Sequence, residues 1–333
     1  IKDTTDEFGR LSTQEIFEAN LSDDKQTESN KNTLIRKSYE YTSTNDGINQ
    51  SEQVSKIKYE GTYSNELNYS YDDSGNIIND GKYEYTYDKN NRLSHTYEIE
   101  TGINKSYTYN SHGLLVNVVT TKGPSILSQV PRTYDGVKII SYDGNPITYD
   151  DLGNPLTYYN GTQFTWQMGR QLESAQLSDG TQISYKYNAD GLRTEKKVGN
   201  KTTSYTLVGS KITGQTDGTN KFYFRYDEND NLVGFELGSD QYFYITNLVG
   251  DIIAIVDNDG NCVVEYEYDP WGVCTIVSDT SNCNLGELNP FRYRGYYYDE
   301  DTSLYYLQSR YYDPVTCKFI NADDPTIIYQ TAY

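Results

Sequence analysis

Residues 71–77 read Tyr-Asp-Asp-Ser-Gly-Asn-Ile, and this phrase decides the fold because variants of it recur along most of the chain. Each copy has Tyr-Asp or a close variant, a few polar residues, Gly or Asn, and then an apolar residue. Neighbouring copies are about 16 to 24 residues apart, which is room for two strands and two tight turns. We therefore expect one β-hairpin per repeat. Further copies begin at Tyr87, Tyr109, Tyr149, Trp166, Tyr187 and Tyr226.

The segments between these phrases favour strand over helix. Residues 82–87 read Lys-Tyr-Glu-Tyr-Thr-Tyr, an alternation with the two-residue period of a half-buried strand. Asp-Gly or Asn-Gly dipeptides recur between the strands, for example at 80–81 and 160–161, and are typical of type I′ hairpin turns. Residues 12–38 are the most polar and least strand-like part, so a helical or irregular insertion fits best there.

The composition agrees with extensive sheet. The chain of 333 residues has 36 Tyr against 9 Phe and 2 Trp, and a tyrosine suits a half-buried sheet because its ring packs while its hydroxyl finds a partner. The formal net charge is −20 and no basic run stands out, so nucleic acid is not an expected partner. No apolar run approaches the roughly 20 residues of a membrane-spanning helix, so a transmembrane protein is not expected.

The cysteines and histidines predict no metal site. Cys262, Cys274, Cys283 and Cys317 form no Cys-x-x-Cys pair, and the chain has only two histidines. A zinc site of the usual spacing is therefore not expected. Whether the four thiols form disulfides stays open, because four scattered cysteines fit one or two disulfides as well as none.

The repeated phrases resemble the YD repeats of bacterial Rhs proteins, insecticidal toxin-complex components, bacillar wall-associated proteins and animal teneurins, over about residues 5 to 285. The C-terminal stretch is similar to the Rhs-associated core, a more specific motif. Residues 290–299 read Pro-Phe-Arg-Tyr-Arg-Gly-Tyr-Tyr-Tyr-Asp, and residues 304–314 read Leu-Tyr-Tyr-Leu-Gln-Ser-Arg-Tyr-Tyr-Asp-Pro. Family members typically carry Gly-Arg-Phe where this chain has Cys-Lys-Phe at 317–319, so the Gly is lost and the Arg is conservatively changed.

The resemblance implies an all-β fold, in which a strip of antiparallel hairpins spirals into a hollow shell and the core segment turns inward as a plug. We accordingly expect a strip over residues 1–285 and a core or plug segment over residues 286–333. The strip is expected to begin inside a repeat, because residues 6–11 match the second half of the phrase and Thr5 stands where its Tyr belongs.

The expected strip has open edges. About thirty strands at ~4.8 Å spacing make a strip on the order of 150 Å long, close to one circumference of a hollow body ~50 Å across. Open strand edges invite pairing. Upstream repeats or a partner shell chain are therefore expected to complete the wall.

The resemblance also implies a function. The chain is predicted to be the scaffold of a secreted or cell-surface protein that encapsulates and delivers a C-terminal toxin or effector domain of its parent chain. The alternative hypothesis is an extracellular adhesion or carbohydrate-binding module without cargo, which contacts glycans or a target-cell receptor. The same surface tyrosines serve both hypotheses, so the residue types do not separate them.

Some members of this family cut themselves just beyond the core through aspartates of the core. The resemblance therefore points to Asp313 and Asp324 as the pair of an intramolecular aspartyl-type peptidase, with Arg310 orienting them and Asp323 as the alternate to Asp324. Two carboxylates held close together cannot both ionise cheaply, which divides their roles into acid and base without a cofactor. The structural alternative is that the two Asp-Pro dipeptides initiate turns and that Arg310 pairs with a carboxylate.

Overall fold

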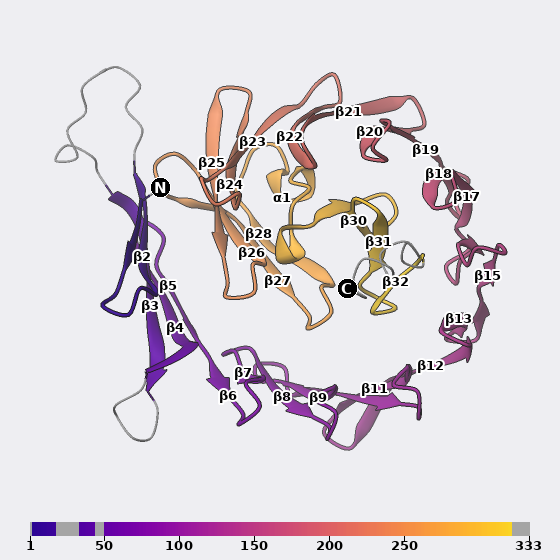
Figure 1. Ribbon diagram of the computed structural model, residues 1–333, viewed down its shortest axis with the longest axis horizontal. Coiled ribbons are helices and arrows are strands. Elements are labelled where there is room, and N and C mark those ends of the chain that lie inside the picture. The colour runs from indigo at the N-terminus through magenta and orange to yellow at the C-terminus, as the bar shows by residue number, and fades with distance from the viewer. Residues whose placement is uncertain (1, 18–32, 44–49, 322–333) are drawn as a thin grey trace, which may run out of the picture. The chain divides into compact units, whose positions relative to one another are not determined.

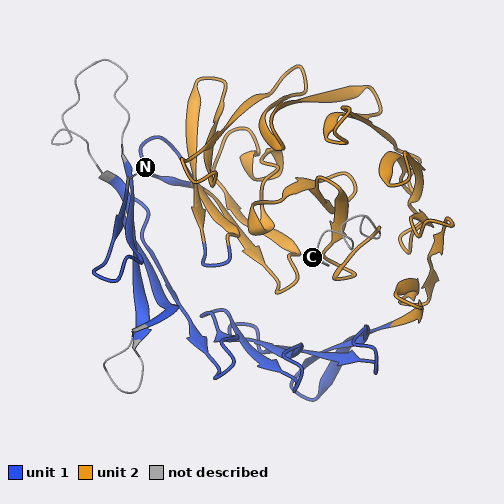
Figure 2. Cartoon of the chain, viewed as in Figure 1, with its two compact units in different colours: residues 1–131, 247–249, 256–262 blue, residues 132–246, 250–255, 263–333 orange. Residues whose placement is uncertain are grey.

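The structure of the protein is a computed structural model, which describes residues 2–17, 33–43 and 50–321. It divides into two compact units (Figure 2). Unit 1 comprises residues 1–131, 247–249 and 256–262, and unit 2 comprises residues 132–246, 250–255 and 263–333. In both units the regular secondary structure of the described residues is almost entirely antiparallel strand, which confirms the predicted all-β class. The predicted boundary between a strip and a core segment near residue 285 stays a prediction.

Unit 1 begins with a five-stranded antiparallel sheet in the order β1-β2-β3-β4-β5. The prediction of an insertion over residues 12–38 is wrong for its described ends, which belong to strands β2 and β3. These ends are extended because Ile16 and Ile35 pair across the two strands and are both buried. The strands are β1 (Lys2–Thr5), β2 (Leu11–Phe17), β3 (Thr33–Ser43), β4 (Gln50–Gly61) and β5 (Asn65–Asn68).

A nine-stranded sheet follows, in which each strand pairs with its neighbours in sequence. Strands β6 to β11 lie in unit 1, and β12 passes into unit 2 between Pro131 and Arg132. The strands are β6 (Ser70–Tyr71), β7 (Ile77–Asn79), β8 (Tyr83–Tyr87), β9 (Leu93–Glu98), β10 (Ile103–Tyr109), β11 (Leu115–Lys122), β12 (Ser125–Asp135), β13 (Lys138–Tyr142) and β14 (Asn145–Pro146).

A fourteen-stranded sheet makes most of unit 2, again with each strand beside its neighbours in sequence. This order is the one expected of an array that adds one hairpin after another. The strands are β15 (Thr148–Tyr149), β16 (Pro155–Thr157), β17 (Gln163–Gln167), β18 (Gln171–Gln176), β19 (Gln182–Tyr187), β20 (Arg193–Val198), β21 (Lys201–Val208), β22 (Lys211–Thr216), β23 (Lys221–Tyr226), β24 (Leu232–Leu237), β25 (Asp240–Thr246), β26 (Ile252–Val256), β27 (Cys262–Tyr268) and β28 (Cys274–Asp279).

The C-terminal segment of unit 2 turns inward, as predicted. The strands of this unit curve around it, so it lies on their concave side (Figure 1). It holds the two short helices of the described chain and a separate four-stranded sheet. Its elements are α1 (Leu285–Leu288), the 3₁₀ turn η2 (Tyr293–Gly295), β29 (Tyr297–Asp299), β30 (Leu304–Leu307), β31 (Arg310–Asp313) and β32 (Lys318–Phe319).

The aspartate of each repeat closes its hairpin turn. In the repeat at Asp72, Oδ1 accepts hydrogen bonds from the backbone N–H groups of Ser74 (2.9 Å) and Asn76 (2.8 Å). The N–H of Gly75, which has a positive φ of 83°, donates to the Asp72 carbonyl. This local carboxylate cap explains why Asp or Asn follows the tyrosine. The same two side-chain contacts occur at Asp6, Asp88, Asn110, Asp150, Asn188, Asp227, Asp257 and Asp269.

Most Asp-Gly and Asn-Gly turns at the other hairpin ends are not of type I′, although Asp143-Gly144 between β13 and β14 has positive φ at both residues, at 50° and 81°. That type needs positive φ at both central residues, but in Asp80-Gly81 only the glycine has it, at 91°. The Asp80 carboxylate accepts hydrogen bonds from the backbone N–H groups of Lys82 (2.9 Å) and Tyr83 (2.7 Å). Because this cap forms with an ordinary Asp backbone, the predicted turn type is wrong at Asp80-Gly81 and likewise at Asn160-Gly161, although the predicted turn positions are right.

The tyrosine of each repeat fastens one hairpin to the preceding one. In Tyr226 the hydroxyl donates to the carbonyl of Ile212 at 2.9 Å, and the strand register shifts just before this residue. The shift turns the ring across the neighbouring strands. The equivalent bonds of 2.7–2.9 Å are donated by Tyr71, Tyr87, Tyr109, Tyr149, Trp166, Tyr187 and Tyr268 to Val54, Ile77, Leu93, Ile139, Pro155, Leu172 and Ile252, respectively.

Replacing such a tyrosine should have a modest effect. We expect Tyr226→Phe to lower the free energy of unfolding by about 0.5–1.5 kcal/mol, the net contribution of one hydrogen bond. The control is Tyr223→Phe on the same strand, because Tyr223 is 45% exposed. Its effect should stay within about 0.5 kcal/mol. Urea denaturation of both variants would test this, and equal losses would contradict a fastening role for the Tyr226 hydroxyl.

Candidate functional site

A buried ion pair attaches the C-terminal segment to the strands of unit 2. Both terminal nitrogens of Arg193 on β20 donate hydrogen bonds to the carboxylate of Asp299, at the end of β29. The side chains of this pair are 0% exposed. Lys196 on the same strand donates to Asp299 at 3.0 Å and to Asp301 at 2.8 Å. Burial by itself raises the pKa of Asp299, but the charges of Arg193 and Lys196 outweigh burial and hold that pKa below its ordinary value. Asp299 is therefore an ionised carboxylate at neutral pH.

Aromatic rings complete the surroundings of Arg193. Its guanidinium lies 4.2 to 5.5 Å from the centroids of four tyrosine rings, a cation–π arrangement that replaces part of the lost hydration. Two of the rings belong to the curved sheet and two to the C-terminal segment, so the cation is shared between them. The four are Tyr185, Tyr205, Tyr297 and Tyr306.

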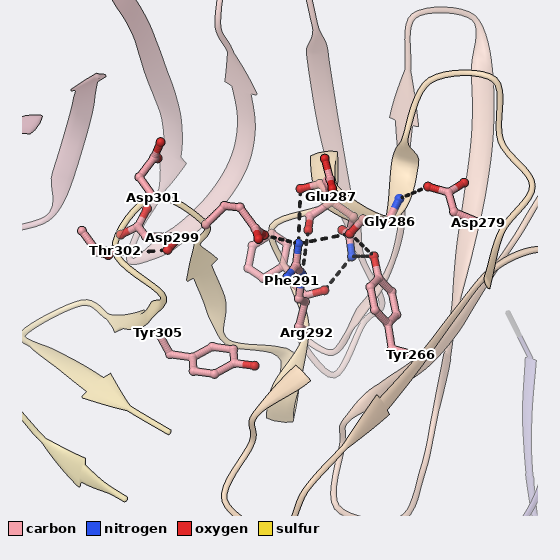
Figure 3. Close-up of polar contacts among 12 residues, drawn as sticks. Tyr266, Asp279, Gly286, Glu287, Phe291, Arg292, Asp299, Asp301, Thr302 and Tyr305 are labelled. Atoms are coloured by element: carbon pink, nitrogen blue, oxygen red, sulfur yellow. Dashed lines mark hydrogen bonds and ion pairs between the residues drawn. The ribbon is translucent and has the colours of Figure 1, made fainter. Parts of the chain in front are cut away.

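A second arginine orders the start of the C-terminal segment. Arg292 donates to the carbonyls of Gly286 (3.1 Å) and Glu287 (3.3 Å) in α1, and to the carboxylate of Glu300 at 2.7 Å (Figure 3). Carbonyls at the end of a helix lack partners within it, so a cation there is stabilising. Tyr266 on β27 donates to the same Gly286 carbonyl at 2.8 Å. These contacts hold α1 against the sheet.

Asp313 lies in a turn that is bonded to the curved sheet. Its Oδ2 accepts a hydrogen bond of 2.8 Å from the hydroxyl of Tyr158, and its Oδ1 accepts one of 2.8 Å from the Val315 N–H. The Tyr158 hydroxyl also lies 3.2 Å from Thr316 Oγ1. Tyr142 donates to the Val315 carbonyl at 3.1 Å. The turn over residues 313–317 is thereby fixed by two tyrosines far upstream in the chain.

The environment of Asp313 favours its protonated form. The residue is 2% exposed, and burial raises the pKa of its carboxyl above the ordinary value although hydrogen bonds from Tyr158, Val315 and Thr316 oppose the shift. Asp299, which is equally buried but faces two cations, has the opposite shift. Opposed pKa shifts of this kind distinguish a carboxyl that can act as an acid from one that holds a charge.

Arg310 does not pair with Asp313. Both residues lie in β31, three positions apart, so their side chains point to opposite faces of the strand. The Arg310 guanidinium stacks over the Phe319 ring at 3.7 Å from its centroid. It also lines a cavity of about 330 Å³ together with Tyr158, Thr316 and residues of the strands β13 and β32. The predicted partners Asp324 and Asp323 lie outside the described residues.

Sequence reasoning missed the residues of the curved sheet that contact the C-terminal segment. Tyr158 begins a turn at Asn160-Gly161, where its N–H donates to the Thr162 carbonyl as the aspartate N–H does in the Tyr-Asp turns. A large aromatic residue at this turn position was the available signal. Arg193 and Lys196 are buried cations on a strand, which Lys or Arg seldom are unless paired. On a regular strand residues three apart face opposite sides, so the spacing carried no such signal; the register shift opposite Lys186 and Tyr187 brings both cations to Asp299.

The sequence left the pairing of the four cysteines open. No disulfide joins the four cysteines, all of which lie within the described part of the chain. Among residues 2–17, 33–43 and 50–321, no three His, Cys, Asp or Glu side chains are grouped so that they could hold a metal ion. No helix in the described ranges has the length and apolar character needed to span a membrane.

Curated relatives cover most of this chain. The tRNA3(Ser)-specific nuclease WapA of Bacillus spizizenii is 34% identical over 256 residues, and the tRNA nuclease WapA of Bacillus subtilis is 35% identical over 256 residues. Each match covers 72% of this chain and 10% of the relative, so the chain spans about a tenth of their length. Teneurin-m of Drosophila melanogaster is 32% identical over 89 residues, which is 27% of this chain and 3% of that protein.

Solved structures share the fold. A crystal structure of TcdB2-TccC3-TEV matches 98% of this chain and 18% of its own with a TM-score of 0.74 and 16% identity. The Tc holotoxin pore of Photorhabdus luminescens gives a TM-score of 0.72 at 16% identity, with the same coverage. The sequence model of the teneurin YD-shell matches residues 5–331. Because that match spans nearly the whole chain and the repeats have the geometry described above, the chain belongs to the teneurin YD-shell family.

Proposed function

We propose that this chain forms part of the wall and the plug of a scaffold, and that this scaffold encloses a C-terminal toxin or effector domain of the parent chain. The observation that carries the proposal is the position of the C-terminal segment, which lies on the concave side of unit 2 and is held there by the fully buried pair of Arg193 and Asp299. A buried ion pair contributes more to fixing a position than to stability. The pair thus fixes the core segment against the curved sheet of unit 2.

The relatives support enclosure of a toxin. The WapA proteins are named as tRNA nucleases, and this chain corresponds to about a tenth of each. We assign the chain the enclosing role and place the toxic activity elsewhere on the parent chain. Upstream repeats or a second shell chain would complete the wall, as the pairing of two components in the TcdB2-TccC3 structures suggests. Such a protein acts outside the cell or at its surface.

The adhesion or carbohydrate-binding hypothesis is not favoured. Its support is the likeness to teneurin-m, which covers 27% of this chain, whereas the WapA matches cover 72%. No contact on the described residues singles out a glycan or a receptor as a partner. The half-buried tyrosines of the repeats, such as Tyr187 and Tyr226, fasten neighbouring hairpins, since their hydroxyls donate to backbone carbonyls.

We further propose that the core segment cuts the parent chain beyond itself. Asp313 in its protonated form, which burial favours, would give a proton to the scissile carbonyl, while Asp324, or Asp323 in its place, would take one from the attacking water. Water then adds across the C–N bond, which breaks to a carboxylate and an amine. Arg310 borders the cavity next to Tyr158 and Thr316, where it could orient an ionised carboxylate. This chemistry needs no cofactor.

The intact mass of the parent chain tests the cleavage. Wild type should show two products with a cut near the end of this sequence. Asp324→Asn should slow cleavage by at least about 100-fold, since a positioned acid or base contributes 10²–10⁴-fold. Asp323→Asn is the matched control, and it should leave the cut in place. An uncut wild type would sink the peptidase proposal, and loss of the cut only in Asp323→Asn would exchange the two roles.

Limited proteolysis tests enclosure separately. Under native conditions a broad-specificity protease should leave the downstream domain of the parent chain intact, whether or not the chain has been cut. The Asp299→Ala variant should expose it, because the core segment then loses its buried anchor. A downstream domain digested equally fast in wild type and variant would contradict enclosure.

A further inference from the structure

Tyr158 connects the candidate acid to the curved sheet. Its hydroxyl lies 2.8 Å from Asp313 Oδ2 and 3.2 Å from Thr316 Oγ1. The three side chains are buried, with exposures of 5% for Tyr158, 2% for Asp313 and 1% for Thr316. We propose that Tyr158 is a positioning residue of the self-cleavage reaction, which links Asp313 to Thr316 through a hydrogen bond that can run in either direction. This inference rests on the proposed cleavage.

A buried acid needs hydrogen-bond partners both when it is protonated and when it is ionised, and a reversible link provides them. When Asp313 is protonated, its O–H can donate to the Tyr158 oxygen, and the Tyr158 hydroxyl can donate to Thr316. When Asp313 is ionised, the Thr316 hydroxyl can donate to Tyr158, which donates to the carboxylate. Each hydroxyl both donates and accepts, so no buried polar atom loses its partner in either state. Asp313 can then release and regain a proton without the turn moving.

The link also makes the acid depend on a distant part of the chain. Tyr158 precedes Asp313 by 155 residues, and it reaches the carboxyl only when the C-terminal turn is bonded to the sheet. The Val315 N–H, which bonds the other oxygen of Asp313, comes from the turn itself. A chain whose core segment is not yet in place therefore has the aspartate but not the environment that lets it act. Cleavage would follow assembly of the plug.

Other titratable groups surround Asp313 without bonding its carboxyl. Burial raises the pKa values of Tyr142 from β13, Tyr159 beside Tyr158, and Tyr312 from β31, and the nearby Asp313 charge raises them further. These hydroxyls are neutral at the pH values of interest. Two charged or ionisable groups lie nearby on the turn and the sheet: Arg132, whose Nη2 lies 3.4 Å from the Val315 carbonyl and 3.8 Å from the sulfur of Cys317, and Lys318, whose Nζ donates to the Val137 carbonyl.

The direct test measures the pKa of Asp313 in this 333-residue chain by carboxyl ¹³C NMR, with the resonance identified by its loss in Asp313→Asn. Tyr158→Phe removes a donor to the carboxylate, which should raise the Asp313 pKa by about one to two units. Tyr159→Phe is the matched control, because it removes a neighbouring hydroxyl that makes no described hydrogen bond to Asp313. An equal shift in the two variants would overturn the link.

A second pair of variants covers the case in which Tyr158→Phe does not fold. Thr316→Val removes a hydroxyl that lies 3.2 Å from the Tyr158 oxygen and that also stabilises the Asp313 carboxylate, so it should raise the Asp313 pKa. Thr316→Ser keeps the hydroxyl and should retain the wild-type value. A purely structural role of Thr316 would instead leave the Asp313 pKa unchanged in Thr316→Val, and that result would also overturn the proposal.

The pH profile of cleavage in the parent chain connects the link to function. If Asp313 acts as the acid, Tyr158→Phe should shift the alkaline limb of the pH–rate profile to higher pH, by as many pH units as it raises the Asp313 pKa. Tyr142→Phe, which loosens the turn but leaves the carboxyl bonded, should lower the rate without moving the limb. An unmoved limb in Tyr158→Phe would overturn the positioning role. An uncut wild type would overturn the cleavage proposal instead, and the NMR result would still decide whether the link exists.

Discussion

Asp299→Ala is expected to lower the free energy of unfolding of unit 2 by about 3–5 kcal/mol, because it leaves a buried arginine without its carboxylate. Arg193 would keep its cation–π contacts but no anion, whereas Lys196 would still have Asp301 at 2.8 Å. Urea denaturation followed by tryptophan fluorescence measures the loss. Both tryptophans lie in unit 2, so the signal reports this unit even if the two units unfold separately.

Two further variants interpret that result. Glu195→Ala breaks the ion pair with Lys186, whose side chain is 70% exposed, and should cost less than about 1 kcal/mol. The double replacement of Arg193 by Met and Asp299 by Leu should recover much of the stability, since apolar side chains often substitute for a buried pair without loss. If Asp299→Ala cost no more than Glu195→Ala, the buried pair would not be the anchor of the C-terminal segment.

Gly272→Ala should also weaken the attachment of this segment, by about 2–4 kcal/mol. A Cβ at this position would lie 2.6–2.9 Å from three ring carbons of Tyr293, and the residue has a positive φ of 94°. The backbone conformation costs about 1–2 kcal/mol and the forced displacement of the ring about 1–3 kcal/mol more. The Gly272 carbonyl also accepts the hydrogen bond of the Tyr305 hydroxyl at 2.8 Å. Denaturation followed by tryptophan fluorescence would show the loss.

Gly218→Ala separates the two contributions. Gly218 has nearly the same φ, 89°, and a Cβ there would meet no atom within 4 Å. Its replacement should therefore cost only the backbone contribution, about 1–2 kcal/mol. If the two alanine variants were equally stable, the close approach of Tyr293 to Gly272 would have no energetic consequence.

The repeats could be predicted from the sequence because the interactions that make them are local. Asp72 bonds to N–H groups two and four residues later, so the phrase that contains it encodes its own turn. Alternation over residues 82–87 likewise predicted β8. The errors were local too. The Asp-Gly dipeptides marked turns but not the turn type, because the aspartate cap and the positive-φ glycine suit more than one type.

The candidate site was predicted only in part. Asp313 was proposed from its place in the core motif; the structure shows that it is buried, and its catalytic role stays a prediction. The expected ionic partnership of Arg310 with that carboxyl is absent from β31, where the two side chains face apart. Tyr158, Arg193 and Lys196 were not identified. The chain has 36 tyrosines, and neither a tyrosine nor a cation on a strand indicates by its residue type which distant residue it contacts.

The sequence by itself determined the all-β class, the hairpin repeat and the turn positions, because each follows from contacts within about one or two repeats, whereas the distinct C-terminal segment was expected from its resemblance to the Rhs-associated core. Only the tertiary structure decided which repeats meet that segment. The bond between Tyr158 and Asp313 joins residues 155 positions apart, and that between Arg193 and Asp299 joins residues 106 apart. Such contacts depend on the twist and curvature that every intervening hairpin adds, and small local differences accumulate along the sheet.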